Sequence, residues 1–265
     1  MATYKYIYLV IVVLSLYMST TTIIVGSPLP RPEFTQELLA LRPAILESAH
    51  RHNVPSVSKI SDADFAVVMT LILYDEDLGS FEEEVRPLRA ITSIRREVET
   101  DINELLGSNL SIRPSNIRPS VAYEILRHQL PVPAPTNTIT VPASVIGSKL
   151  TTRTEISQRD LYREITREIA QPDKAVEYLA TNLERGIYRA QYEGVPVHWK
   201  VLLAWHIRGI VSPRDIQNNR DAYNYTQRVT YLGYACKLIY SKGHQSGSQI
   251  CGFPDAASRA MMRPR

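Results

Sequence analysis

A buried helix over residues 61–79 is the clearest element that the hydrophobic pattern predicts in the body of the chain. Ser61 and Asp64 have the spacing of a capping box, which fixes where this helix begins. Between residues 65 and 74 only Thr70 is polar, so the helix has no polar face to turn toward water. A helix of this kind is usually enclosed within a domain, and we expect it to lie in the core.

The same predicted helix ends in a group of acidic residues, Asp75, Glu76 and Asp77, shortly before Gly79. An ionised carboxylate is disfavoured at the C-terminal end of a helix, because the helix dipole is negative there. A carboxyl group that is also half-buried should have a raised pKa. That environment suits a general acid, which must still hold its proton near neutral pH. The alternative is an acidic helix end that is simply solvated.

Apolar residues recur at helical spacing through most of the remaining sequence. Several of these segments carry helix-start signals, namely Pro119, Pro172 and the capping-box pair Ser157 and Asp160. Pro43 interrupts the first segment, which therefore forms either one bent helix or two short ones. The pattern predicts a mainly α fold with a small polar hairpin or loop region. Helices are predicted over residues 34–52, 119–130, 157–169, 172–194, 196–209 and 222–240, and the later part of the charged stretch 81–106 predicts an amphipathic surface helix or a pair of them.

Two segments interrupt these helices and predict irregular structure. Residues 107–118 are polar and contain Pro114, which indicates a loop or short hairpin that leads into the helix at Pro119. A loop of this kind is well placed to present polar groups to a ligand. Residues 131–154 are rich in Pro, Thr and Ser, which favours a surface connector with a brief strand near residues 139–141.

Histidines and tyrosines near the ends of the predicted helices have ordinary structural explanations. His50 and His52 lie at the end of the helix over residues 34–52, where a histidine is explained by the helix dipole and by capping. We therefore do not expect a catalytic role for them. The last predicted helix, over residues 222–240, is rich in tyrosine, and core packing is the simplest role for most of these rings.

The first 27 residues predict an export signal peptide or an N-terminal membrane anchor. Residues 6–25 are almost entirely apolar or hydroxylated, contain no acidic residue and follow Lys5. A single helix over residues 6–25 would reach the length that spans a bilayer, which favours an uncleaved anchor. Either alternative makes the remainder extracytoplasmic. It divides into a proline-rich spacer at 28–35, one helical domain at 36–242 and a disordered basic tail at 243–265.

Composition and charge limit the partners. The 265 residues, 44% of them hydrophobic, are enough for one domain with a full core. A net charge of +3 suits an anionic polymer or a cell-wall surface and is too weak to indicate nucleic acid. Cys236 and Cys251 have no His or Cys neighbours at zinc spacing, so we expect no metal site and no cofactor. They can form one disulfide outside the cytoplasm.

Three of these features follow one another in an order that resembles the lysozyme-like fold of soluble lytic transglycosylases and goose-type lysozymes. In that family a buried helix ends in the catalytic glutamate, and Glu76 in Leu-Tyr-Asp-Glu-Asp is similar. The family's next motif, Gln-x-x-Pro-x-Thr-Ala, resembles residues 116–122, with Asn116 in the place of the glutamine. Its Ala-Tyr-Asn-x-Gly motif resembles Ala-Trp-His-Ile-Arg-Gly at 204–209, and its final Tyr-Val element resembles Tyr225 and the residues that follow.

The resemblance extends over about residues 40–240 and has clear departures. Asp77 stands where the family has Ser or Gly after the catalytic glutamate. The glycines of the family's hairpin are replaced around Leu110 and Arg113, and the interval between Glu76 and Asn116 is long.

The resemblance implies cleavage of the β-1,4 bond between N-acetylmuramic acid and N-acetylglucosamine in peptidoglycan, with Glu76 as the proton donor. It implies that Asn116 and Tyr225 orient the sugar and its acetamido group. Trp205 and Tyr223 are candidates for stacking on sugar faces, and His206 is a further candidate site residue. The expected partners are glycan strands, together with the membrane if the N-terminal segment is retained, and the expected state is a monomer.

Three alternatives remain open. One is an inactive wall-binding or scaffold protein of the same fold, and another is an anchored helical interaction module in which Glu76 is solvated. A helix-turn-helix over residues 198–216 is disfavoured by the export segment.

Overall fold

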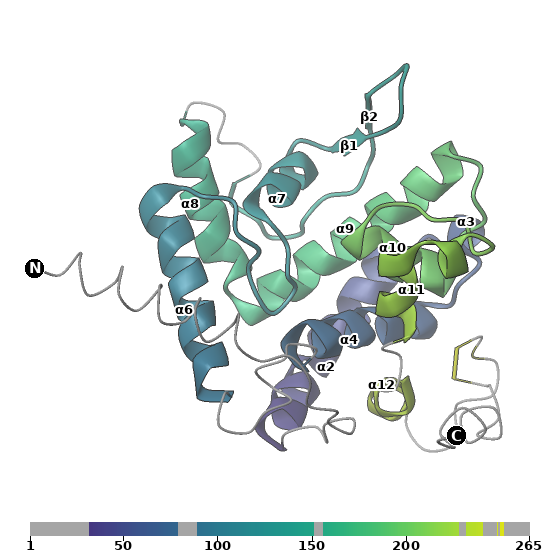
Figure 1. Cartoon of the computed structure of the whole chain (residues 1–265), viewed down its shortest axis with the longest axis horizontal. Coiled ribbons are helices and arrows are strands. Elements are labelled where there is room, and N and C mark those ends of the chain that lie inside the picture. Colours follow the sequence, from purple (N-terminus) through teal and green to yellow (C-terminus); the bar gives the residue numbers. More distant parts are fainter. Residues whose placement is uncertain are drawn as a thin grey trace, which may run out of the picture.

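The chain is mainly helical, with one two-stranded sheet, in a computed structural model that describes residues 32–78, 89–150, 156–227, 232–240, 248 and 250–251 (Figure 1). This confirms the mainly α fold with a small hairpin that the hydrophobic pattern predicts. The predicted N-terminal segment, residues 1–27, lies outside the described residues, as does most of the predicted tail, residues 243–265. Within the described part of the chain, no helix is both long enough and apolar enough to cross a bilayer.

The expected buried helix is α4 (Asp62–Leu78), and it lies at the centre of the core. Its start is fixed as predicted, because the Ser61 hydroxyl accepts a hydrogen bond of 3.1 Å from the backbone N–H of Asp64. Every residue from 65 to 74 is buried, and Thr70 donates its hydroxyl proton to the carbonyl of Ala66 at 2.8 Å. The one polar side chain of this run is thus satisfied within its own helix.

Helix α4 is enclosed by helices from both ends of the sequence. It packs against α2 (Pro32–His52), α10 (Trp199–Ile207) and α12 (Leu232–Ile239), while the long helix α9 (Pro172–Tyr192) packs against α2 and α10 (Figure 1). The α2 helix starts at Pro32, inside the predicted spacer, because proline fits the first turn of a helix. It continues through Pro43 as a single helix, which is one of the two alternatives that the sequence left open.

A second group of helices lies beside this core. It contains α6 (Arg89–Leu106), α7 (Pro119–Leu126) and α8 (Gln158–Ile169), and α8 packs against both others and α9. Ser157 caps α8 as predicted, since its hydroxyl accepts from the N–H of Asp160 at 3.1 Å. A short four-residue helix, α3 (Pro55–Ser58), joins α2 to α4. The predicted loop at 107–118 is closed by one antiparallel bridge between Ile112 and Ile117.

The sheet is a hairpin of β1 (Gln129–Pro131) and β2 (Thr138–Thr140), with Leu130 opposite Ile139. It confirms the brief strand expected near residues 139–141. The prediction that residues 131–154 form a surface connector is wrong in part. This segment contributes to a second apolar cluster, which consists of Leu130, Val132, Val141 and Ala143 and packs against Trp205. Its Pro, Thr and Ser content concealed the alternate apolar positions that turn inward.

The tyrosine-rich C-terminal region does not form one helix over residues 222–240. After a 3-10 turn, η2 (Ile216–Asn218), the chain forms α11 (Arg220–Gln227) and then α12 (Leu232–Ile239). Cys236 of α12 is joined to Cys251 by a disulfide, the pairing that the sequence allows. Cys251 thus lies against α12.

Candidate functional site

Glu76 lies in the last turn of α4, and its side chain is 11% exposed. The guanidinium of Arg113 donates a hydrogen bond to the backbone carbonyl of Glu76. A positive charge at this position complements the negative end of the helix dipole and satisfies one of the last carbonyls of the helix. The contact also holds the loop at 107–118 against the end of α4, beside the candidate acid.

Tyr225 reaches the same carboxyl group from the other end of the sequence. Its hydroxyl donates a hydrogen bond of 3.1 Å to Oε1 of Glu76, although the two residues are 149 positions apart. Tyr225 belongs to α11 and is 5% exposed. Packing therefore fixes its ring in the orientation that directs the hydroxyl at the carboxyl group. The structure therefore brings together two of the residues that the motif order selected.

His206, in the last turn of α10, is the third member of this group. Its Nε2 atom lies 3.9 Å from Oε1 of Glu76, and its ring stacks on that of Tyr225 with centroids 6.5 Å apart. Burial lowers the pKa of His206 to about 4, so the ring is neutral at neutral pH. The contact with Glu76 is consequently not an ion pair there, and 3.9 Å is longer than a hydrogen bond.

Asn116 lies on the loop that Arg113 holds against α4. It has a positive φ of 53°, a left-handed conformation that asparagine tolerates better than most residues. The neighbouring side chains of Ile112, Ser115 and Ile117 are buried, whereas Asn116 itself is half-buried. Asn116 thus lies on a turn whose apolar residues point inward, three residues after the Arg113 that contacts the end of α4.

The two candidate stacking residues have different surroundings. The indole N–H of Trp205 donates to the carbonyl of Asn182 at 2.7 Å, and its ring lies so close to Gly186 that a Cβ there would come within 2.5 Å of it. Trp205 therefore packs α10 onto α9. Tyr223 lies on α11 and is 41% exposed, so its ring is accessible to a ligand. The side chain of Asp77, the residue that departs from the family motif, lies outside the described part of the chain.

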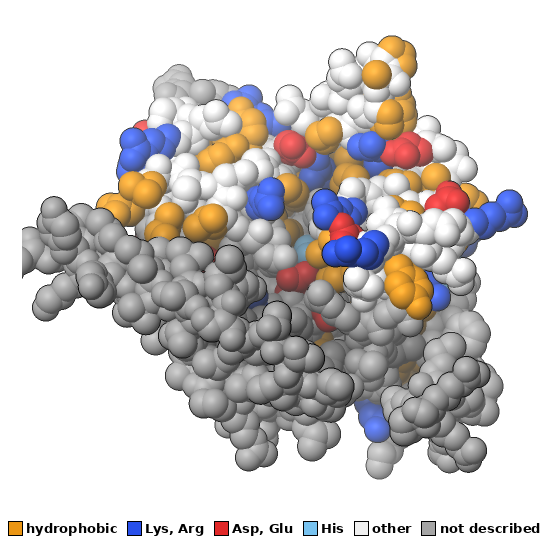
Figure 2. Space-filling model, in the orientation of Figure 1, with side chains coloured by type: hydrophobic (Ala, Val, Ile, Leu, Met, Phe, Trp, Pro, Cys, Tyr) orange, Lys and Arg blue, Asp and Glu red, His pale blue; other side chains and the backbone are white. Residues whose placement is uncertain are grey.

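On the surface, these elements border a hollow. Figure 2 shows a recess between the α7 side of the molecule and α10 and α11, with a histidine and acidic side chains near its base and Lys or Arg side chains around it. Among the described residues, no group of three or more His, Cys, Asp and Glu side chains has the arrangement of a metal site. The chemistry that this group supports is proton transfer by a half-buried carboxyl group with a tyrosine donor.

Comparisons with protein-family models, with curated proteins and with solved structures found no match to this chain.

Sequence reasoning did not assign Arg113 or Arg185 a role. Arg185, on α9, is almost completely buried and forms an ion pair of 2.6 Å with Glu124 of α7. Burial lowers the pKa of Arg185, and its pairing with Glu124 opposes that shift. Neither arginine belongs to a periodic pattern, so no signal in the sequence indicated that Arg113 holds the loop at 107–118 against α4 or that Arg185 joins α9 to α7.

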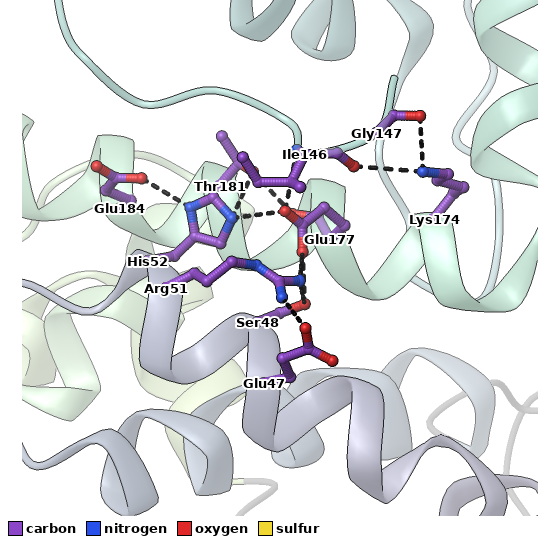
Figure 3. Close-up of polar contacts among 10 residues, drawn as sticks. All are labelled: Glu47, Ser48, Arg51, His52, Ile146, Gly147, Lys174, Glu177, Thr181 and Glu184. Atoms are coloured by element: carbon purple, nitrogen blue, oxygen red, sulfur yellow. Dashed lines mark hydrogen bonds and ion pairs between the residues drawn. The ribbon is translucent and has the colours of Figure 1, made fainter. Parts of the chain in front are cut away.

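A second polar cluster, between α2 and α9, has a different character (Figure 3). His52 is bonded through Nε2 to Glu177 at 2.9 Å and through Nδ1 to Glu184 at 2.8 Å. Burial opposes the charged ring, but the two carboxylates outweigh it and raise the pKa of His52. His52 lies in the last turn of α2 as expected, but the helix dipole and capping do not account for its two carboxylate partners.

Glu177 is the centre of this cluster. It accepts from Ser48 at 2.5 Å, from Arg51 at 2.7 Å and from the backbone N–H of Ile146 at 3.0 Å, as well as from His52. Burial alone would raise the pKa of Glu177, yet these donors lower it to about 2. Ser48, His52 and Glu177 are each at most 3% exposed, so the cluster has no surface on which to bind a substrate and instead joins two helices.

Proposed function

We propose that the protein cleaves the β-1,4 bond between N-acetylmuramic acid and N-acetylglucosamine in peptidoglycan, with Glu76 as general acid. The observation that carries this proposal is the hydrogen bond between Tyr225 and Glu76. The resemblance to lytic transglycosylases and goose-type lysozymes selected these two residues from separate motifs. Their contact across 149 positions is what a shared active site requires and what unrelated surface residues would rarely make.

The proposed reaction begins with proton transfer from the Glu76 carboxyl group to the glycosidic oxygen. The bond between that oxygen and the anomeric carbon breaks, its electron pair stays on the leaving oxygen, and an oxocarbenium-like centre forms. Either a water or a hydroxyl group of the same sugar then attacks this centre and returns a proton to the Glu76 carboxylate. This scheme uses one carboxyl group, because neighbouring Asp75 is buried and lies on the same helix as Glu76 rather than across a cleft from it.

Two further features support an extracytoplasmic enzyme that acts on an anionic cell-wall polymer. The Cys236–Cys251 disulfide is typical of proteins outside the cytoplasm. Lys and Arg side chains lie at several points on the described rim of the recess in Figure 2, and they would attract the carboxylates of peptidoglycan. We propose accordingly that the N-terminal segment directs or anchors the protein outside the cytoplasm.

The proposal is tested by digestion of purified peptidoglycan with the full chain, followed by mass spectrometry of the released muropeptides. We expect cleavage by the unmodified protein and a loss of about 100-fold or more in Glu76→Gln, which has nearly the same shape but no acidic proton. Glu37→Gln, on the exposed side of α2, is the matched control and should cleave normally. The product mass also distinguishes a hydrolysed sugar from an anhydro sugar.

Absence of cleavage by the unmodified protein, or equal cleavage by the Glu76→Gln protein, would contradict the assignment. Sedimentation with isolated sacculi then separates the alternatives. Binding without cleavage indicates a wall-binding or scaffold protein of the same fold, and absence of binding indicates an interaction module.

A further inference from the structure

His206 has an unusual environment for a histidine at the end of a helix. Its side chain is 2% exposed, and among the described residues neither ring nitrogen has a hydrogen-bond partner. A buried polar group without a partner is costly to the folded protein. Helix capping does not explain it, because Arg208 follows His206 at the end of α10 and the ring turns inward.

Among the described residues, the groups that face His206 come from two other helices. Glu76 of α4 presents Oε1 at 3.9 Å, and the ring of Tyr225 of α11 stacks on the imidazole. The charged residue nearest in sequence, Arg208, is exposed and pairs with Asp221 of α11. From α9, the helix on the other side, the contacts go to Trp205 rather than to His206. The imidazole is thus directed at the Glu76 carboxyl group.

We propose that His206 is a positioning residue for Glu76, with its Nε2–H donating a hydrogen bond to Oε1 as Glu76 becomes a carboxylate. This inference rests on the proposed function of Glu76 as general acid. The gap of 3.9 Å closes to about 2.9 Å by a small rotation of either side chain. Tyr225 and His206 then hold the same carboxylate oxygen from two sides.

The timing of this hydrogen bond makes it useful for the reaction. In the resting state the distance is too long for a hydrogen bond, whereas the attraction grows as the proton leaves Glu76 and negative charge develops on Oε1. Interactions that strengthen only in the transition state raise kcat rather than lower KM. His206 itself gains and loses no proton in this step, in agreement with the lowered pKa that burial gives it.

Three substitutions test the role of the Nε2–H group. His206→Gln keeps an N–H donor near the position of Nε2, His206→Asn moves the donor back toward the position of Nδ1, and His206→Phe retains a ring without any donor. We expect kcat for muropeptide release to fall about 10- to 100-fold in the Asn and Phe proteins, with KM unchanged and with substantial recovery in the Gln protein. Circular dichroism and thermal unfolding verify that each variant is folded.

Normal kcat in the His206→Phe protein, or a loss that appears only in KM, would overturn the proposal. So would equal losses in the Gln and Phe proteins when both are folded, because a merely structural role would not depend on the donor.

A measurement without substrate keeps this inference separate from the proposed function. In protein labelled with ¹⁵N and ¹³C, NMR follows the ionisation of Glu76 and the Nε2–H resonance of His206 through the same pH range. We expect the Nε2–H resonance to shift with the ionisation of Glu76, and this shift to be absent in Glu76→Gln. If the resonance shifts but peptidoglycan is not cleaved, the positioning contact stands and the proposed reaction fails. A resonance that does not respond to Glu76 overturns the contact whatever the activity.

Discussion

At the scale of single residues, Tyr225 contacts Glu76 through its hydroxyl group. Replacement by phenylalanine removes the hydroxyl that donates to Glu76 and leaves the buried ring in place. We predict that the Tyr225→Phe protein folds normally and releases muropeptides about 10-fold or more slowly, because a hydrogen bond to a developing carboxylate is lost. Tyr192→Phe, at the exposed end of α9, is the matched control and should retain full activity. Equal losses in the two proteins would contradict a specific role for Tyr225.

The sequence predicted the residues that lie near Glu76, but it did not predict the direction of a neighbouring side chain, Trp205. Glu76 followed from an apolar helix with an acidic end, and Tyr225 and His206 followed from the order of the motifs. The direction of Trp205 did not, although it precedes His206. Adjacent residues on a helix point about 100° apart, so that Trp205 faces α9 while His206 faces α4. Tertiary packing decides that α9 lies beside Trp205 and α4 beside His206. No local sequence pattern indicates which helix lies on which side.

At the scale of elements, the junction between α2 and α9 depends on Glu177 and its donors. We predict that Glu177→Gln lowers the free energy of unfolding by about 3 kcal/mol or more, because His52 and Arg51 lose the carboxylate that compensates their charges. Glu47→Gln is the matched control, since Glu47 pairs with the same Arg51 but lies on the surface. Its effect should stay below about 1 kcal/mol. Urea unfolding of the three proteins measures both differences.

The same cluster gives the stability of the protein a defined dependence on pH. The pKa of Glu177 is lowered to about 2. The contribution of Glu177 to the free energy of unfolding is therefore present above the ordinary pKa of a glutamate and is lost as the pH falls toward 2. The pKa of His52 is raised, so its contribution is present below the ordinary histidine pKa and is lost as the pH rises through the raised value. In the Glu177→Gln protein, the free energy of unfolding should depend less on pH in both ranges. If its dependence on pH is unchanged, other groups cause that dependence.

The bounds of the elements were predictable wherever a local signal marked them. The cap at Ser61 and the cap at Ser157 fixed the starts of α4 and α8. The prediction was less successful where two local signals disagree. Pro43 normally ends a helix, but α2 as a whole packs against α4 and α9, and the helix continues. The single helix predicted over residues 222–240 corresponds to two elements in the structure, α11 and α12.

At the scale of the whole molecule, Tyr240 and Ser248 near the C-terminus bind the first turn of α4, at the opposite end of the helix from Glu76. Asp64, in the first turn of α4, accepts hydrogen bonds from Tyr240 at 2.9 Å and from Ser248 at 2.5 Å. The disulfide between Cys236 and Cys251 encloses Tyr240 and Ser248 in a loop with a sequence separation of 15 residues. Because a helix rises about 1.5 Å per residue, Glu76 lies roughly 18 Å along α4 from Asp64.

We predict that this disulfide stabilises the fold without contributing to the chemistry. A cross-link that closes a loop of this length contributes about 3 kcal/mol by restricting the unfolded chain. The double variant Cys236→Ser, Cys251→Ser should therefore unfold at a lower urea concentration, while its rate of muropeptide release per folded molecule stays at the level of the unmodified protein. Reductant should shift the unfolding midpoint of the unmodified protein in the same direction and leave that of the double variant unchanged. A loss of activity in the folded double variant would instead place α12 and its tether within the functional machinery of the recess.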